Sequence, residues 1–330
     1  MSNIVWKPQD YHLKSSNIAK FISHINEKFL LEIDQYDQLY EWSINNPSIF
    51  WDNISKFCGI NFSHQPKNIL ERHESFIGSK WFEGATLNFA ENLLKHKDDS
   101  LAIEYFCEDK IKGKITYKEL HEQVRVCYLH LKSLGVKKGD RVAGYLPNIP
   151  QTIIAMLATS ALGAVWSSCS PDFGIRGVLD RFEQINPKVL FVADGYFYKG
   201  KKIDLTSNIL EIQSSLSSLK ETICINIVNA KKNIQVSYWE DIPKNEGKIN
   251  FEPVTFSHPL YIMYSSGTTG KPKSIVHSVG GTLIQHLKEL VLHCDLKKED
   301  KIFYFTTCGW MMWNWLVSSL SIGATVVLYD

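Results

Sequence analysis

The chain has 330 residues, of which 44% are hydrophobic and 22% are charged, and its formal net charge is +1. This length and apolar content predict a globular protein with more than one domain-sized unit and exclude a disordered chain. A net charge close to zero gives no reason to expect nucleic acid or an anionic membrane as a partner.

The seven cysteines are odd in number and scattered, and no two form a C-x-x-C pair. The pattern argues against a disulfide framework and a structural zinc site, so we predict no metal site of this kind and a reducing compartment. The first residues have no basic head followed by an apolar stretch and therefore do not resemble a signal peptide. We expect a cytoplasmic protein.

Residues 1–95 are predicted to form a helical and aromatic N-terminal unit. Apolar periodicity indicates amphipathic helices at residues 16–31 and 36–51, a turn at 81–84 and a helix at 87–94. Nothing in this unit is typical of a catalytic site, and its aromatic side chains are most simply packing residues.

Residues 96–330 are predicted to form a second unit in which strands and helices alternate. Gly135 is suited to cap a helix, and Pro150 is suited to begin one. The expected helices cover residues 117–134, 151–162, 175–184 and 281–292, and the expected strands cover 141–146, 188–193, 223–228, 260–264, 274–277 and 301–305, with a short strand near Val165. Such alternation predicts an α/β fold with mostly parallel sheet flanked by helices.

The segment from Trp310 to Tyr329 contains no charged residue over twenty positions, which is long enough to span a bilayer. Its polar residues and the break at Gly323 instead favour a buried helix at 310–321 followed by a strand at 324–329. We expect this last strand to be a bare parallel edge strand, since no crossover helix follows it. On this basis the sequence is expected to be cut inside a domain.

The most informative segment is Tyr264-Ser-Ser-Gly-Thr-Thr-Gly-Lys-Pro-Lys273, which follows an apolar run. Its glycines would let backbone N–H groups approach phosphates, its hydroxyls add donors and its lysines offset charge. It is not a Walker A loop, because Ser265 and Pro272 stand where that pattern needs Gly and Ser or Thr. The simpler alternative is a polar hairpin turn, since the same residue types are common in turns.

This ten-residue string resembles the phosphate loop of the adenylate-forming enzymes, and the resemblance covers essentially the whole chain. Residues 115–120 and 135–142 resemble early motifs of that superfamily, and residues 80–92 resemble the N-terminal extension of short-chain acyl-CoA synthetases. Residues 166–174 and 306–315 are most similar to the acetoacetyl-CoA synthetases. The sequence departs from the family pattern at Glu83, where proline is usual, and at Ser278, where glycine is usual.

The resemblance implies a fold of stacked, mostly parallel sheets flanked by helices, with a helical N-terminal extension. It also implies an acid–thiol ligase that uses ATP and Mg²⁺ to convert acetoacetate into an acyl-adenylate and then forms a thioester with coenzyme A. The family's catalytic lysine lies beyond residue 330, so the catalytic residue stays unknown and we expect little activity from this portion alone. A separately encoded C-terminal portion is then a candidate partner.

Two alternatives stay open at this point. The substrate could be acetate or propionate, although residues 310–315 argue against both. The chain could also be a non-catalytic remnant of an interrupted gene.

The resemblance assigns three sets of site residues. Those expected to hold the ATP phosphates are Ser265, Ser266, Gly267, Thr268, Thr269, Gly270, Lys271 and Lys273. Those expected to shape the acyl pocket and thioester tunnel are Trp310, Met311, Met312 and Trp313, for which plain core packing is the alternative. Those expected near coenzyme A are Lys199, Lys201 and Lys202, for which a solvated cluster is the alternative. His277 receives no proton-transfer role.

Overall fold

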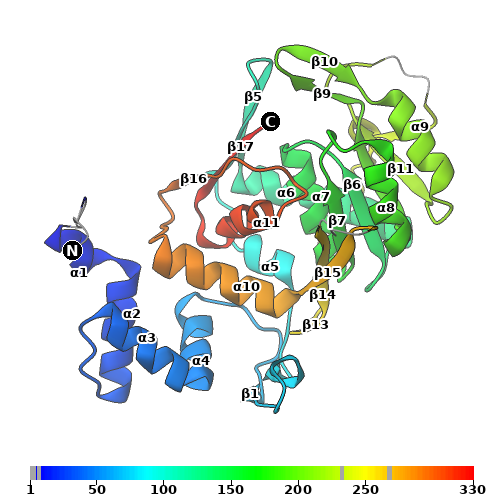
Figure 1. Cartoon of the computed structure of the whole chain (residues 1–330). Helices are drawn as coiled ribbons and strands as arrows, with labels where there is room; N and C mark the ends of the chain where they lie inside the picture. The colour runs from blue at the N-terminus through cyan, green and yellow to red at the C-terminus, as the bar shows by residue number, and fades with distance from the viewer. Residues whose placement is uncertain (1–4, 6–8, 231–233, 266–269) are drawn as a thin grey trace.

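The computed structural model describes residue 5 and residues 9–230, 234–265 and 270–330. Within these residues, two larger sheets have helices between them and on their outer faces, and the N-terminal helices lie to one side (Figure 1). The prediction of an α/β fold with mostly parallel, stacked sheets is confirmed.

The larger sheet has seven strands in the order β12-β11-β8-β6-β7-β14-β15. All neighbouring pairs are parallel except β14–β15, which is an antiparallel hairpin. The strands are β6 (Arg141–Tyr145), β7 (Val165–Cys169), β8 (Val189–Ala193), β11 (Glu221–Ile225), β12 (Ser237–Tyr238), β14 (Pro259–Ser265) and β15 (Lys273–Ser278).

Helices cover both faces of this sheet because its strands are apolar on both sides. In β8, Val189 and Phe191 belong to one core cluster, whereas Leu190 and Val192 belong to another. The first cluster contains side chains of α6 (Tyr117–Ser133) and α7 (Pro150–Ala161). The second contains side chains of α8 (Ile175–Ile185) and α9 (Thr206–Ser215). A parallel sheet buried on both faces is the expected result of such strands.

The second sheet has the order β16-β17-β4-β5. Its strands are β4 (Leu101–Cys107), β5 (Ile111–Thr116), β16 (Lys301–Phe303) and β17 (Thr325–Tyr329). The strand predicted at 324–329 is present, but the prediction that it would be a bare edge strand is wrong. It pairs in parallel with β16 on one side and β4 on the other. The partner strand β4 lies far earlier in the chain, so local sequence could not reveal it.

The N-terminal region contains α1 (Asp10–Ser15), α2 (Asn17–Phe29), α3 (Tyr36–Asn45) and α4 (Pro47–Phe57). The single helix predicted at 36–51 is wrong, because it is two helices that meet at Asn46 and Pro47. A residue before proline is disfavoured in the helical region, and proline is well suited to a first helical position. The turn predicted at 81–84 is wrong for residues 81–83, which belong to strand β2 (Lys80–Glu83) and pair with β1 (Asn68–Glu71); the turn lies at Gly84.

The remaining elements connect these layers. They are a 3₁₀ turn (Phe76–Gly78), β3 (Thr86–Leu87), α5 (Phe89–Leu93), β9 (Gly195–Tyr198), β10 (Lys201–Asp204), a 3₁₀ turn (Trp239–Asp241), β13 (Val254–Thr255), α10 (Val279–Lys288), a π-helical turn (Glu289–His293), α11 (Met311–Val317) and a 3₁₀ turn (Ser318–Ile322). Gly323, at φ 90°, separates α11 and its 3₁₀ turn from β17, as predicted. Among the described residues, no helix has the length and apolar character needed to cross a membrane.

Candidate functional site

The candidate site lies where the parallel strands of the larger sheet end. Strand β6 has β7 on one side and β8 on the other. The chain leaves β6 towards α7 and leaves β7 towards α8, and these two helices pack on opposite faces. Such a reversal opens a crevice at the carboxyl ends of the strands, which is where open α/β sheets bind their ligands. Strand β14 is parallel to β7, so its carboxyl end at Ser265 lies at the same edge.

The segment 306–313 crosses this edge. The hydroxyl of Ser168, in β7, donates to the carbonyl of Cys308 at 2.7 Å. The thiol of Cys308 lies 3.0 Å from the carbonyl oxygen of Leu146, just after β6. These contacts place the start of α11 directly over the switch point between the two strands.

Asn148 joins this segment to both sheets. Its Oδ1 accepts a hydrogen bond from the buried indole of Trp313 at 2.9 Å. Its Nδ2 donates to the carbonyls of Thr306 and Tyr329 at 3.3 and 3.1 Å, and its backbone N–H donates to the carboxylate of Asp330 at 2.8 Å. The loop after β6 is therefore tied to the end of β17 and to α11 at once.

The predicted acyl-pocket residues differ in exposure. Trp310 is 64% exposed and Met311 is 41% exposed, whereas Met312 is half-buried and packs against the main core. Trp313 is fully buried. The side chains of Trp310 and Met311 are exposed enough to contact a ligand. The buried Trp313 instead anchors the start of α11 through its hydrogen bond to Asn148. Asn314 donates to the carbonyl of Trp310 at 3.3 Å, which holds the first turn of α11.

The predicted phosphate loop connects β14 to β15. Ser265 pairs with Lys273 at the end of the hairpin. Ser266, Gly267, Thr268 and Thr269 lie outside the described residues. Gly270 has φ +127°, a conformation that favours glycine, and a Cβ there would meet nothing within 4 Å. Lys271 and Lys273 are both exposed.

The hairpin is supported from below by aromatic and cationic side chains. The phenol of Tyr264 donates to the carbonyl of Arg181 at 3.1 Å, and burial raises the pKa of this phenol. The guanidinium of Arg181 lies 5.6 Å from the ring centroid of Tyr264 and 4.6 Å from that of Phe173. Cation–π contacts of this kind join α8 to the end of β14.

The start of β15 also contacts α8. The ammonium of Lys271 lies 3.6 Å from a carboxylate oxygen of Glu183. The side-chain amide of Gln184 donates to the carbonyl of Pro272 at 2.9 Å and accepts from the hydroxyl of Ser274 at 2.9 Å. Glu183 and Gln184, at the end of α8, therefore contact Lys271, Pro272 and Ser274 around the start of β15.

The predicted coenzyme A lysines lie in the β9–β10 hairpin, which follows β8 at the same sheet edge. Lys199 has φ 51° and stands over the ring of Tyr198 at 5.3 Å. Lys202 donates to the carbonyl of Val228 at 3.2 Å, while Lys201 is exposed. The β9–β10 hairpin lies beside the β4–β5 hairpin (Figure 1). The backbone N–H of Gly200 donates a hydrogen bond to the carboxylate of Glu108, between β4 and β5, at 2.8 Å.

Burial controls the other titratable groups near the site. The pKa of His277 is lowered by burial, and its ring lies 5.0 Å from that of Tyr261. Burial raises the pKa of the Cys169 thiol to about 12 and raises that of Cys308 as well. These thiols stay protonated at neutral pH and are poor nucleophiles.

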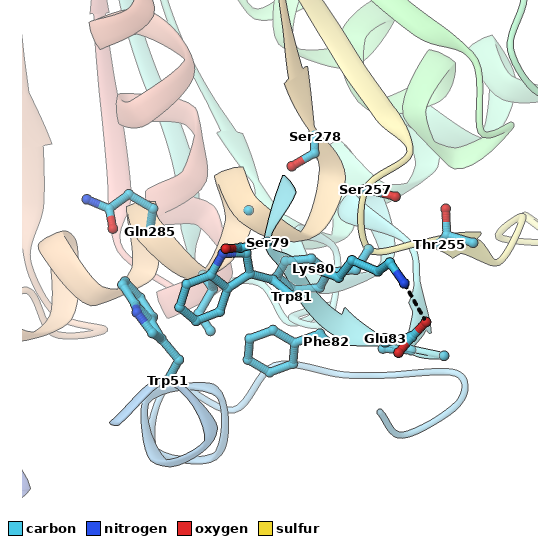
Figure 2. Close-up of a pocket in the computed structure, with 15 residues that line it drawn as sticks. Trp51, Ser79, Lys80, Trp81, Phe82, Glu83, Thr255, Ser257, Ser278 and Gln285 are labelled. Atoms are coloured by element: carbon cyan, nitrogen blue, oxygen red, sulfur yellow. Dashed lines mark ion pairs between the residues drawn. The ribbon is translucent and has the colours of Figure 1, made fainter. Parts of the chain in front are cut away.

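A separate cavity of about 530 Å³ lies between the N-terminal region and α10 (Figure 2). Trp51, Trp81 and Phe82 form its apolar wall. Glu83 and Ser278, the two positions at which the sequence departs from the family pattern, both line it. Ser278 ends β15, whereas the phosphate loop precedes that strand, so this cavity lies at the opposite end of β15 from the candidate site.

Sequence reasoning did not identify Asn148, Arg181, Glu183 or Gln184 as parts of the site. Asn148 carried one usable signal, since it is a polar residue two positions after the strand predicted at 141–146. The three α8 residues carried none, because their contacts with the hairpin join positions about eighty to ninety residues apart.

Comparison with known proteins agrees with this geometry. A family model described as "AMP-binding enzyme" matches residues 89–330, and one described as "Acetyl-coenzyme A synthetase N-terminus" matches residues 36–93. The chain is 43% identical to an acetoacetyl-CoA synthetase of Danio rerio over 100% of this chain and 51% of the relative. It is 38% identical to a malonamoyl-CoA synthetase of Penicillium aethiopicum over 96% of this chain and 46% of the relative.

Among solved structures, acetoacetyl-CoA synthetase from Streptomyces lividans superposes with a TM-score of 0.95 at 41% identity, covering 100% of this chain and 51% of that one. The chain thus spans about half the length of the relatives that it matches. A family model that covers most of the chain, together with these relatives, shows that the chain belongs to the AMP-binding enzymes.

Proposed function

We propose that this chain supplies the nucleotide-phosphate and acyl-binding part of an ATP-dependent acetoacetate–CoA ligase. In the first step, a carboxylate oxygen of acetoacetate attacks the α-phosphorus of ATP, and pyrophosphate leaves. In the second step, the sulfur of coenzyme A attacks the acyl carbon, and AMP leaves with the bonding electrons.

The observation that carries the proposal is the position of the loop rich in glycine and hydroxyls. It follows β14 at the carboxyl edge of a parallel sheet, beside the switch point, and presents Lys271 and Lys273 to solvent. Catalysis of adenylation consists mainly of positioning and charge neutralisation around phosphoryl oxygens, and such a loop is suited to that task. The proposed phosphate contacts are Ser265, Ser266, Gly267, Thr268, Thr269, Gly270, Lys271 and Lys273.

The acyl group would lie against the exposed face of Trp310 and Met311, with Met312 behind them. An aromatic ring and adaptable thioethers form an apolar slot that suits a small ketoacid. In this proposal Trp313 acts as a support. The similarity to a malonamoyl-CoA synthetase favours a three- or four-carbon acid with a second carbonyl as the substrate class.

Coenzyme A would approach from the β9–β10 hairpin, where Lys199 and Lys201 are exposed and could pair with its phosphates, with Lys202 beside them. Magnesium would arrive with ATP. Among the described residues, no group of three or more His, Cys, Asp or Glu could hold a metal ion, so we assign the ion no ligand in this chain.

Three further expectations belong to this proposal. Residues 1–95 would form the extension and residues 96–330 the adenylation unit, incomplete at the carboxyl end. The remaining half of the enzyme would be joined to this chain or encoded separately. The reaction would take place in the cytoplasm.

The test is calorimetric titration of the purified chain with ATP and magnesium. Replacing Lys273 with alanine removes a charged phosphate contact and should weaken binding by about 1.5–3 kcal/mol. The control is Lys56→Ala, which removes a lysine that pairs with Asp52 in α4, outside the site. Equal affinity for both variants would contradict the proposed role of the loop.

A further inference from the structure

The end of α8 contacts the phosphate hairpin on both of its strands. Arg181 accepts from Tyr264 in β14, while Gln184 bonds to Pro272 and Ser274 around the start of β15. These contacts come from less than two turns of one helix. The helix therefore holds the hairpin from one side, at the end of β14 and at the start of β15.

Gln184 fixes the peptide between the two lysines. Its amide donates to the carbonyl of Pro272, which stands between Lys271 and Lys273, and to the carbonyl of Asp180 at 2.6 Å within α8. Its Oε1 accepts from Ser274. One side chain thereby sets the orientation of the backbone from which both lysines project.

Glu183 lies beside the first of these lysines. Its carboxylate is 3.6 Å from the ammonium of Lys271, with the two side chains 45% and 63% exposed. An ion pair this exposed is weak in water. A polyphosphate carries several negative charges, so it would compete for Lys271 and would also be repelled by Glu183.

We propose that Gln184 is a positioning residue for polyphosphate binding and that Glu183 is the counter-ion that polyphosphate displaces from Lys271. The inference rests on the proposed function of the loop and adds two residues outside it. The two residues have opposite effects on polyphosphate affinity. Gln184 orients the backbone that carries Lys271 and Lys273, whereas Glu183 pairs with Lys271 and competes with the ligand.

The experiment titrates the purified 330-residue chain with inorganic tripolyphosphate at low ionic strength. Glu183→Gln removes the competing charge and should tighten binding about two- to fivefold. Gln184→Met keeps the length of the side chain but loses its hydrogen bonds, and it should weaken binding about three- to tenfold. Tighter binding by one variant and weaker binding by its neighbour is not expected from a general loss of stability.

The matched control is Asp180→Asn. It removes the same charge from the same helix, at a position that faces Arg176 at 3.9 Å and not the loop. It should leave the affinity unchanged. A gain equal to that of Glu183→Gln would overturn the inference, because net charge alone would then explain both.

If the Gln184→Met variant does not fold, Ser274→Ala provides a second test. It removes the hydrogen bond between the Ser274 hydroxyl and Gln184 by changing the donor instead of the acceptor. It should weaken binding in the same direction. A wild-type chain that binds while Glu183→Gln and Ser274→Ala are unchanged overturns this inference alone. A wild-type chain that does not bind tripolyphosphate overturns the proposed function together with it.

Discussion

At the scale of single residues, Asn148 connects several segments near the site. One amide side chain satisfies the indole of Trp313 and two backbone carbonyls from different segments, all at a nearly dry position. Buried polar groups of this kind cost little while every partner is satisfied and much when one is removed. The position of Trp310, at the start of α11, therefore depends on a buried residue that cannot itself contact a ligand.

Replacing Asn148 with alanine should lower the free energy of unfolding by about 1–3 kcal/mol, because the indole N–H of Trp313 loses its partner in a buried place. Urea unfolding followed by far-UV circular dichroism measures this change. The Trp313→Phe variant removes the donor, so the double variant should cost less than the sum of the two single changes. Strict additivity would show that the hydrogen bond contributes nothing.

His286 is a second residue whose effect can be measured. It is 5% exposed, and burial lowers its pKa from 6.5 to about 3, with His277 adding to the shift. Its Nδ1 lies 2.8 Å from the hydroxyl of Ser318, which itself donates to the carbonyl of Asn314. Because that hydroxyl has already used its hydrogen, Nδ1 carries the proton of a neutral imidazole.

The pH dependence of stability follows from this neutral imidazole. The folded pKa lies below the unfolded one, so the stability that His286 contributes is present above pH 6.5 and is lost as the pH falls towards about 3. His286→Asn keeps a donor near Nδ1 but cannot titrate. Between pH 6.5 and 4.5 the variant should lose stability less steeply than the wild type, by about 1.4 kcal/mol per pH unit. Parallel urea-derived profiles would contradict the assignment.

At the scale of elements, local signals decide where helices begin. Helix α6 begins with a capping box, in which the hydroxyl of Thr116 accepts from Glu119 N–H at 3.2 Å and the Glu119 carboxylate accepts from Thr116 N–H at 2.8 Å. These hydrogen bonds lower the pKa of Glu119. The helix matters for both sheets, since Tyr117 in its first turn donates to the carbonyl of Ala324 at 2.7 Å.

The Thr116→Ala variant should lower the free energy of unfolding by about 1 kcal/mol, because an orphan N–H of the first turn loses its acceptor. Chemical denaturation measures the loss. Thr116→Ser retains the hydroxyl and should recover most of it. A serine variant as unstable as the alanine variant would mean that the methyl group, and not the cap, stabilises this end of α6.

The same local signals explain which elements the sequence could predict. Gly135 ends α6 with φ +74°, and Pro150 begins α7, as expected from their chemistry. Pro47 also indicated a helix boundary, but the apolar periodicity on both sides of it favoured one long helix. Strand pairing could not be predicted in this way. Strand β17 pairs with β4, which lies more than two hundred residues earlier, and no local sequence pattern indicates that partner.

The candidate site divides in the same way. The loop at 264–273 is a continuous string whose composition predicts phosphate binding, so it could be proposed from sequence alone. The supporting contacts of Gln184 and Asn148 are made across 88 and 165 residues, and the sequence does not reveal the partner of either residue. The sequence thus indicates the groups that would touch a ligand, while the groups that orient them require the structure.

At the scale of the whole molecule, the two sheets are joined at the site and not only through their cores. Asn148, after β6 of the larger sheet, bonds to Tyr329 and Asp330 at the end of the smaller one. Burial raises the pKa of Asp330, and the nearby carboxylates of Asp172 and Glu108 add to the rise. A rigid junction at this edge would hold the exposed start of α11 and the β14–β15 hairpin in a fixed relation, which the proposed adenylation requires.

The 330-residue chain contains this junction, and its catalytic activity can be tested without the rest of the enzyme. The chain spans 51% of the length of the relative from Danio rerio, and the resemblance implies that the catalytic lysine and other groups of the family's carboxyl half lie beyond residue 330. Phosphate contacts without those groups can bind ATP but position its α-phosphorus poorly. We therefore expect the isolated chain to bind ATP and to catalyse little acetoacetate-dependent exchange of pyrophosphate into ATP.

The assay follows labelled pyrophosphate entering ATP, with a full-length acetoacetyl-CoA synthetase as the positive control. Adding the purified carboxyl-terminal half of such a relative to the chain tests complementation directly. Exchange that appears only in the mixture, and that falls when Lys273 is replaced by alanine, would assign the missing steps to the added half and phosphate binding to this one. Robust exchange by the chain alone would contradict the prediction, because Lys271, Lys273 and the start of α11 would then suffice for adenylation without the carboxyl-terminal half.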